Sequence, residues 1–240
     1  FNNLGNLLNS SIKNAGGGFE CGLLLANTPR EFNNIEPFYK WFCTTEKIGH
    51  WGLSEKSREK VLSADSFQES YTTLAKEYSL IVEKNLDQII DKTPRYTFEL
   101  TSICSKLEND VPLLITQKNI FSLYNSYKKR NYSLLAFTYR ISKFIYNLHK
   151  ISSRDNVRVV TLESMVKQPT RVLKELSKLI PSINMDDSVQ LNYKLNPLKS
   201  DYDIDLEYKK AIEQLNGVER FVLNIFNKRL TFIERKFKII

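Results

Sequence analysis

Two short apolar segments constrain the fold of this chain more than any other feature: "VPLLITQ" at 111–117 and "VRVVTLE" at 157–163. Each is an apolar run bounded by proline or polar residues, which is typical of a buried strand. Between them, residues 120–151 carry apolar side chains at helical spacing, with a break near Asn131. Strands separated by helices of this length pair in parallel, so we predict an α/β fold whose parallel sheet is flanked by helices on both faces.

The rest of the chain continues this alternation of helices and short strands. We expect helices at 4–12, 66–86, 96–110, 169–180 and 201–240, and short strands at 19–24 and 88–91. The first helix ends at the "AGGG" of 15–18, and Pro169 suits the first turn of the fourth. Because the sequence has no internal repeat, low-complexity linker or break in composition, we predict one domain over residues 1–240 with a helical C-terminal part.

Cysteine, histidine and hydropathy patterns exclude several classes of protein. No window approaches the roughly 18 uninterrupted apolar residues of a membrane span, and the N-terminus lacks the basic and small-residue regions of a signal peptide. Cys21, Cys43 and Cys104 form no C-x-x-C pair, which indicates reduced thiols in a soluble, cytoplasmic protein. His50 and His149 have no metal-ligand spacing around them, so no metal site is expected.

The net charge of +8 indicates an anionic partner, which is a nucleic acid, a phosphorylated cofactor, an acidic polysaccharide or a membrane surface. A basic overall composition without a dedicated partner explains the charge equally well. Because the charge is spread along the chain and no nucleic-acid-binding signature is present, a nucleic-acid partner is not expected.

The stretch "IIDKTPRY" at 89–96 places Lys92 just past a predicted strand. Gln117 and Glu163 also follow predicted strands, and ligands of parallel α/β sheets bind at the carboxyl ends of the strands. An ammonium group at this edge can neutralise the charge on a departing oxyanion. The alternative is a surface lysine in an ordinary strand-to-helix turn, paired with Asp91.

Two further segments carry candidate binding or catalytic groups. The helix predicted after Gln117 directs the positive end of its dipole at an anion, and basic residues at 118 and 128–130 add positive charge. Its alternative is a solvated basic helix face. Glu20 lies in an apolar setting that raises the pKa of a carboxyl group and suits it to proton abstraction. Its alternative is a structural carboxylate paired with a lysine.

Taken in order, these segments resemble the layout of the sulfotransferase superfamily. "DKTP" at 91–94 is similar to the family's "EKTP", and "VVTLESMVKQPTRVLKEL" at 159–176 is similar to its last conserved element, with Glu163 at the acidic position. The resemblance covers roughly residues 1–183. It implies a P-loop-like α/β sandwich that transfers a sulfuryl group from 3′-phosphoadenosine 5′-phosphosulfate (PAPS) to a hydroxyl or amine.

The resemblance also assigns roles to individual residues. It implies that Glu20 is the catalytic base and that Lys92 is an active-site lysine. Asn2 and Asn3 fall at the end of the loop that binds the 5′-phosphosulfate, while the first strand and most of that loop are expected to precede Phe1.

The residues implied to bind the 3′-phosphate of the cofactor lie at and after the strand of 111–117. They are Gln117, Asn125 and Tyr127. Where the family has Arg-Asp-Pro, this chain has Gln-Lys-Asn at 117–119, so Lys118 or Arg130 takes the place of the arginine.

We therefore expect a single-domain sulfotransferase that uses PAPS, releases adenosine 3′,5′-bisphosphate and needs no metal. Its acceptor is a saccharide or a small metabolite. One alternative is a non-catalytic, sulfotransferase-like anion-binding protein. A second is a P-loop kinase-type phosphotransferase, for which the chain lacks a "GKS" or Asp-rich metal motif.

Overall fold

The computed structural model describes residues 8, 11–18, 20–44, 50–184 and 203–237. The first half of the chain forms β1 (Ala15–Gly16), η1 (Leu23–Leu25), η2 (Pro29–Asn34), α2 (Phe38–Cys43), α3 (Glu55–Leu62), α4 (Phe67–Val82), β2 (Gln88–Ile89), η3 (Pro94–Phe98) and α5 (Leu100–Lys106), where η marks a 3₁₀ helix. The second half forms β3 (Leu113–Gln117), α6 (Ile120–Lys128), α7 (Leu134–Ile151), β4 (Val157–Thr161), α8 (Leu162–Lys167), α9 (Pro169–Ser177), α11 (Ile204–Glu213) and α12 (Gly217–Glu234).

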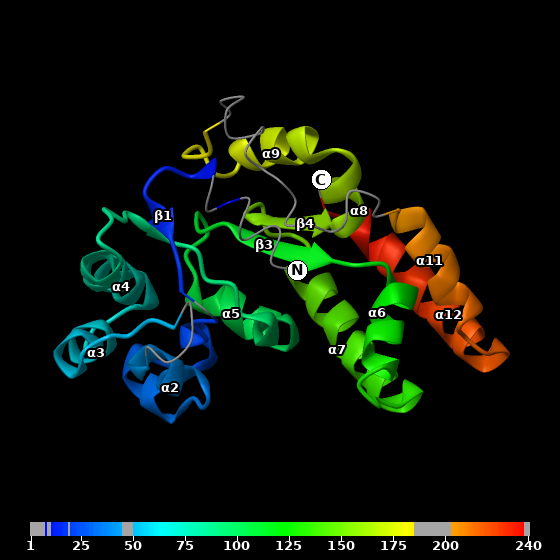
Figure 1. The fold of residues 1–240 in the computed structure, drawn as a ribbon, viewed down its shortest axis with the longest axis horizontal. Helices are drawn as coiled ribbons and strands as arrows, with labels where there is room; N and C mark the ends of the chain where they lie inside the picture. Colours follow the sequence, from blue (N-terminus) through cyan, green and yellow to red (C-terminus); the bar gives the residue numbers. More distant parts are fainter. Residues whose placement is uncertain (1–7, 9–10, 19, 45–49, 185–202, 238–240) are drawn as a thin grey trace.

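The strands pair in parallel, as predicted, but the described residues form two small sheets rather than one. β1 pairs with β2, and β3 pairs with β4 over five residues, from Leu113 opposite Val157 to Gln117 opposite Thr161. The described part of the chain is therefore a mixed α/β structure made mostly of helices (Figure 1).

Helices cover both faces of the β3–β4 sheet. Successive side chains of a strand point to opposite faces, so neighbouring residues of β4 contact different helices. Val157 and Val159 pack with the apolar side chains of α6 and α7 on one face. Val160 packs with Val172 and Leu176 of α9 on the other. Figure 1 shows the same order of layers, with α9 above the strands and α6 and α7 below them. α11 and α12 pack against α6 and α7 and extend this part of the core.

Several helix boundaries follow from local signals. The Ser66 hydroxyl accepts a hydrogen bond from the Glu69 N–H and so caps α4. Pro169 occupies the first turn of α9. The predicted break between α6 and α7 falls at Asn131, whose φ of 60° is left-handed and incompatible with a continuing helix.

The strand expected at 19–24 is wrong. Gly22 has a φ of 75°, which ends any extended segment, and Leu23–Leu25 form η1 instead. A Cβ at Gly22 would lie 2.3 Å from the Phe38 ring, so this position requires glycine for space as well as for conformation. Of the helix expected at 4–12, Leu8, Ser11 and Ile12 are described: Leu8 and Ser11 are helical, whereas Ile12 forms an antiparallel bridge with Ile183.

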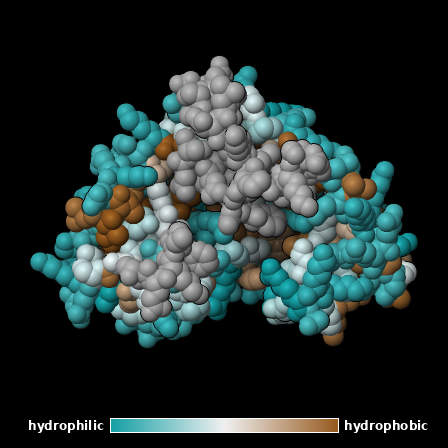
Figure 2. All heavy atoms as spheres, viewed as in Figure 1, coloured by the Kyte–Doolittle hydropathy of each residue, from teal (hydrophilic) through white to brown (hydrophobic). Residues whose placement is uncertain are grey.

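The N-terminal half has its own apolar core beneath α2, α3 and α4. Trp51 is fully buried there, with ring-centre distances of 5.3 Å to Phe42 and 4.8 Å to Tyr78. The face of the molecule in Figure 2 is largely hydrophilic, apart from a hydrophobic patch over α4. No helix among the described residues combines the length and the apolar character that a membrane span requires.

Candidate functional site

The segments that follow β1 and β2 meet at one edge of their sheet. Because the two strands are parallel, their carboxyl ends lie side by side. The Gly22 N–H donates to the Thr93 hydroxyl at 2.9 Å, and the Leu24 N–H donates to the Tyr96 hydroxyl at 3.2 Å. These hydrogen bonds join residues 20–24 to the "DKTPRY" segment that follows β2, although about 70 residues separate them in the sequence.

At this junction the two predicted catalytic side chains interact electrostatically. Partial burial raises the pKa of the Glu20 carboxyl group, and the positive charge of nearby Lys92 acts in the opposite direction. The negative charge of Asp91 raises the Glu20 pKa further. Glu20 is therefore a carboxyl group whose proton affinity is increased and on which the charge of Lys92 acts.

Asp91 lies at the centre of a buried hydrogen-bond network beneath this pair. Its carboxyl group accepts hydrogen bonds from the hydroxyl groups of Tyr71 at 2.5 Å, Tyr96 at 2.6 Å and Thr93 at 2.8 Å. The backbone of Cys21 contributes another. Burial nevertheless raises the pKa of Asp91, because desolvation destabilises the carboxylate by more than these hydrogen bonds stabilise it.

Sequence reasoning considered Asp91 only as an ion-pair partner of Lys92 and missed this network. Asp91 and Cys21 lie at the ends of the two strands, while Tyr71 comes from α4. Burial and the negative charge of Asp91 raise the pKa values of Tyr71, Tyr96 and the Cys21 thiol well above their usual ranges, so these groups keep their protons. The network is a rigid support for the segments that carry Glu20 and Lys92.

The residues predicted to bind the 3′-phosphate begin at the carboxyl end of the other sheet. Gln117 ends β3 opposite Thr161. The Lys118 ammonium nitrogen lies 3.7 Å from a carboxylate oxygen of Glu207 in α11. Asn119 caps α6, since its side-chain oxygen accepts from two backbone N–H groups of the first turn. Positive charge from Lys118 is therefore partly neutralised at the start of α6.

Asn125, Tyr127 and Arg130 lie further along or beyond α6. The Asn125 amide donates to the backbone oxygen of Ala211 at 2.9 Å and is buried between α6 and α11. The Tyr127 ring packs with Phe137, at 5.2 Å between ring centres, and with Arg140. Because a helix rises about 1.5 Å per residue, Tyr127 lies about 10 Å along the axis from the start of α6. The structure therefore spreads these residues along the helix instead of gathering them at its N-terminus.

The remaining residues predicted to belong to the site are Glu163, Asn2 and Asn3. Glu163 lies in the first turn of α8, which the Thr161 hydroxyl caps. Asn2 and Asn3 lie outside the described residues. Within the part of the chain that the structure describes, no three His, Cys, Asp or Glu side chains are grouped to hold a metal ion.

Comparison with known proteins found no matching protein-family model, no similar curated protein and no similar solved structure.

Proposed function

We propose that this chain is a sulfotransferase that moves a sulfuryl group from PAPS to the hydroxyl or amine of a saccharide or small metabolite. The observation that carries the proposal is that hydrogen bonds to Thr93 and Tyr96 join the segments of Glu20 and Lys92 at the carboxyl end of the β1–β2 sheet, where the charge of Lys92 acts on Glu20. Parallel α/β sheets bind ligands at this edge. The similarity of the "DKTP" segment to the family motif supports the same assignment.

In the proposed reaction, the acceptor oxygen or nitrogen attacks the sulfur of PAPS while Glu20 takes the acceptor's proton. The bond between sulfur and the bridging phosphate oxygen breaks, and its electron pair stays on the 5′-phosphate of adenosine 3′,5′-bisphosphate. Lys92 stabilises the charge that develops on that oxygen. The raised pKa of Glu20 makes it a better proton acceptor than an ordinary carboxylate.

The cofactor would extend from the β1–β2 edge towards α6. Asn2 and Asn3 are proposed to contact the 5′-phosphosulfate, and Gln117 and Lys118, at the start of α6, are the proposed contacts of the 3′-phosphate. Asn125, Tyr127 and Arg130, which are spread along or beyond α6, are further candidates for that role. The chemistry relies on positioning and charge stabilisation by side chains of this chain.

Calorimetric titration of the intact chain with adenosine 3′,5′-bisphosphate tests cofactor binding, and transfer of labelled sulfate from PAPS to a panel of hydroxyl and amine acceptors tests catalysis. Glu20→Gln and Lys92→Ala should each lower the transfer rate about 10²- to 10⁴-fold, as expected for loss of a base or of charge stabilisation. The exposed matched controls Glu108→Gln and Lys84→Ala should leave the rate unchanged. Absence of bisphosphate binding, or unchanged rates in both active-site variants, would overturn the proposal.

A second candidate is a non-catalytic anion-binding protein of the same type. It is favoured by the surroundings of Asn125 and Lys118, whose polar groups contact Ala211 and Glu207 of α11. In that case the intact chain does not bind adenosine 3′,5′-bisphosphate, and no acceptor receives sulfate.

A further inference from the structure

The helices α7 and α12 each expose a row of apolar side chains. On α7, Leu135, Tyr139 and Tyr146 are 81%, 72% and 57% exposed, and their spacing places them on one face of the helix. On α12, Phe221, Ile225 and Phe232 follow the same kind of spacing, and both phenylalanine rings are more than 60% exposed (69% and 62%). Large side chains exposed in such rows indicate an interaction surface.

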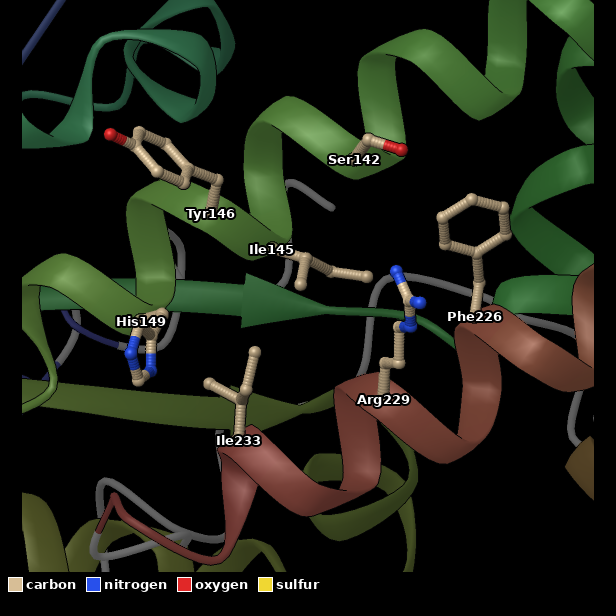
Figure 3. A pocket seen from close by; sticks show the side chains of 7 residues that line it. All are labelled: Ser142, Ile145, Tyr146, His149, Phe226, Arg229 and Ile233. Carbon is tan, nitrogen blue, oxygen red and sulfur yellow. The ribbon is translucent and has the colours of Figure 1, made fainter.

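A groove of about 260 Å³ is lined by residues of both helices. Figure 3 shows α7 and α12 running alongside each other, with Ser142 and Phe226 at one end and His149 and Ile233 at the other. Tyr146 belongs to both the exposed row and the groove. We call the two rows together with this groove the α7–α12 face.

The charges on these two helices are predominantly positive. The sequence of α7 contains Arg140, Lys143 and Lys150 and no acidic residue. Arg140 packs over the Phe98, Tyr127 and Tyr132 rings and Lys143 pairs with Glu99, so Lys150 is the α7 cation beside the exposed row. The segment 217–237 contains five cations and two acids. Of those acids, Glu219 is buried and bonded to Lys128 and Tyr124, and the Glu234 side chain lies outside the described part.

Basic groups also lie directly beside the exposed rings. The Lys150 ammonium is 4.7 Å from the centre of the Tyr146 ring, and the Lys236 ammonium is 5.6 Å from the centre of the Phe232 ring. Arg229 lines the groove itself, where Figure 3 shows its side chain extending between the two helices. Exposed aromatic rings flanked by lysine and arginine are the combination that settles at the interface of an anionic membrane.

We propose that the α7–α12 face docks this protein onto a lipid surface that carries anionic headgroups. The aromatic and aliphatic side chains enter the headgroup region, while the basic side chains remain at the level of the phosphates. The proposal is independent of the sulfotransferase function, because none of the residues of this face belongs to the proposed catalytic or cofactor-binding set.

The charge of the α7–α12 face and the size of its groove favour a lipid surface over a second copy of the chain and over a small-molecule ligand. A second copy of the chain would bring the same cations against one another, which opposes self-association through this face. The groove is smaller than the pockets of about 300–1,000 Å³ that enclose small-molecule ligands. The rows of exposed rings also extend the surface well beyond a single ligand site.

Co-flotation with vesicles tests the proposal. The intact chain should float with vesicles of phosphatidylcholine mixed with phosphatidylserine, much less with phosphatidylcholine alone, and less as the salt concentration rises. The double variant Phe221→Ser/Phe232→Ser should bind the mixed vesicles about tenfold more weakly. Lys150→Ala and Arg229→Ala should each weaken binding about fivefold.

Two controls make the test specific. Leu80→Ser removes a 77% exposed apolar side chain from α4 and should leave vesicle binding unchanged. Lys84→Ala removes an exposed cation near the end of the same helix and should also have no effect. Circular dichroism of each variant checks that the fold is retained.

Several results would overturn the proposal. One is the absence of binding to the mixed vesicles, and another is equal binding by wild type and the folded Phe221→Ser/Phe232→Ser variant. A third is a dimer, seen by sedimentation, that this double variant dissociates while neither form binds vesicles. That result would assign the α7–α12 face to a second copy of the chain.

Discussion

The Thr93 hydroxyl accepts a hydrogen bond from the Gly22 N–H at 2.9 Å and donates one to the Asp91 carboxyl group at 2.8 Å. A single side chain therefore connects the turn after Glu20 to the network below Lys92. Thr93 is only 6% exposed, so bulk water cannot easily take the place of its hydroxyl as hydrogen-bond partner of the Gly22 N–H or of the Asp91 carboxyl group. The geometry of the candidate catalytic pair depends on this connection.

Thr93→Val should lower the free energy of unfolding by about 1–3 kcal/mol, because it leaves the buried Gly22 N–H without this acceptor at unchanged side-chain volume. Urea denaturation measures the effect. Thr72→Val is the matched control, since the Thr72 hydroxyl is exposed and bonds only within its own helix, and it should change stability by less than about 0.5 kcal/mol. Equal stability of the two variants would contradict a structural role for Thr93.

The raised pKa of Asp91 predicts how stability depends on pH. A carboxyl group whose pKa is higher in the folded state favours folding most below its ordinary pKa. This contribution is lost as the pH rises through the raised value. The free energy of unfolding should therefore fall less steeply between acid and neutral pH in Asp91→Asn than in the wild type. Urea denaturation midpoints measured across that pH range give the slope. An unchanged slope would show that Asp91 titrates alike in the folded and unfolded chain.

The elements that sequence reasoning placed well have strong local signals. The apolar runs at β3 and β4, the capping residue Ser66 and the left-handed position at Asn131 all act within a few residues of the element that they define. The strand predicted at 19–24 failed because Gly22 is in a left-handed conformation and packs closely against the Phe38 ring. That contact depends on the tertiary fold.

In the candidate site, too, features set by the local sequence could be predicted, and features set by the tertiary fold could not. The position of Lys92 just past a strand could be predicted from the order of the elements. Glu20, expected inside a strand at 19–24, instead follows β1, and the parallel pairing of β1 with β2 joins the two segments. The Asp91 network could not be predicted from the sequence, because the Tyr71 hydroxyl that donates to Asp91 belongs to a different element, α4. The partner of Asn125 is the backbone of α11, 86 residues later, and no local pattern indicates it.

Glu77 should stabilise the packing of α3 on α4 in a pH-dependent way. Hydrogen bonds from Lys60 at 2.5 Å and Ser57 at 2.6 Å hold the pKa of Glu77 below its usual range. A lowered pKa gives stability that is present above the ordinary value and is lost as the pH falls through the folded one. Glu77→Gln should cost about 1 kcal/mol at neutral pH, because Lys60 is half-exposed, and nothing in strong acid. Chemical denaturation at both pH values checks this, and the exposed Glu108→Gln should show no such pH-dependent loss.

Asn125 is a buried amide whose structural role can be separated from a role in cofactor binding. Its amide donates to the Ala211 oxygen at 2.9 Å and to the Gln214 side chain at 3.3 Å, so Asn125→Ala should lower the free energy of unfolding by about 1–3 kcal/mol. Asn224→Ala, at an exposed position of α12, is the matched control and should be nearly neutral. Titration of both variants with adenosine 3′,5′-bisphosphate then tests the cofactor role. A fall in affinity of tenfold or more in the folded Asn125 variant alone supports a 3′-phosphate contact, because the side chain would then bind the cofactor as well as α11. Unchanged affinity together with the loss of stability would assign Asn125 to helix packing only.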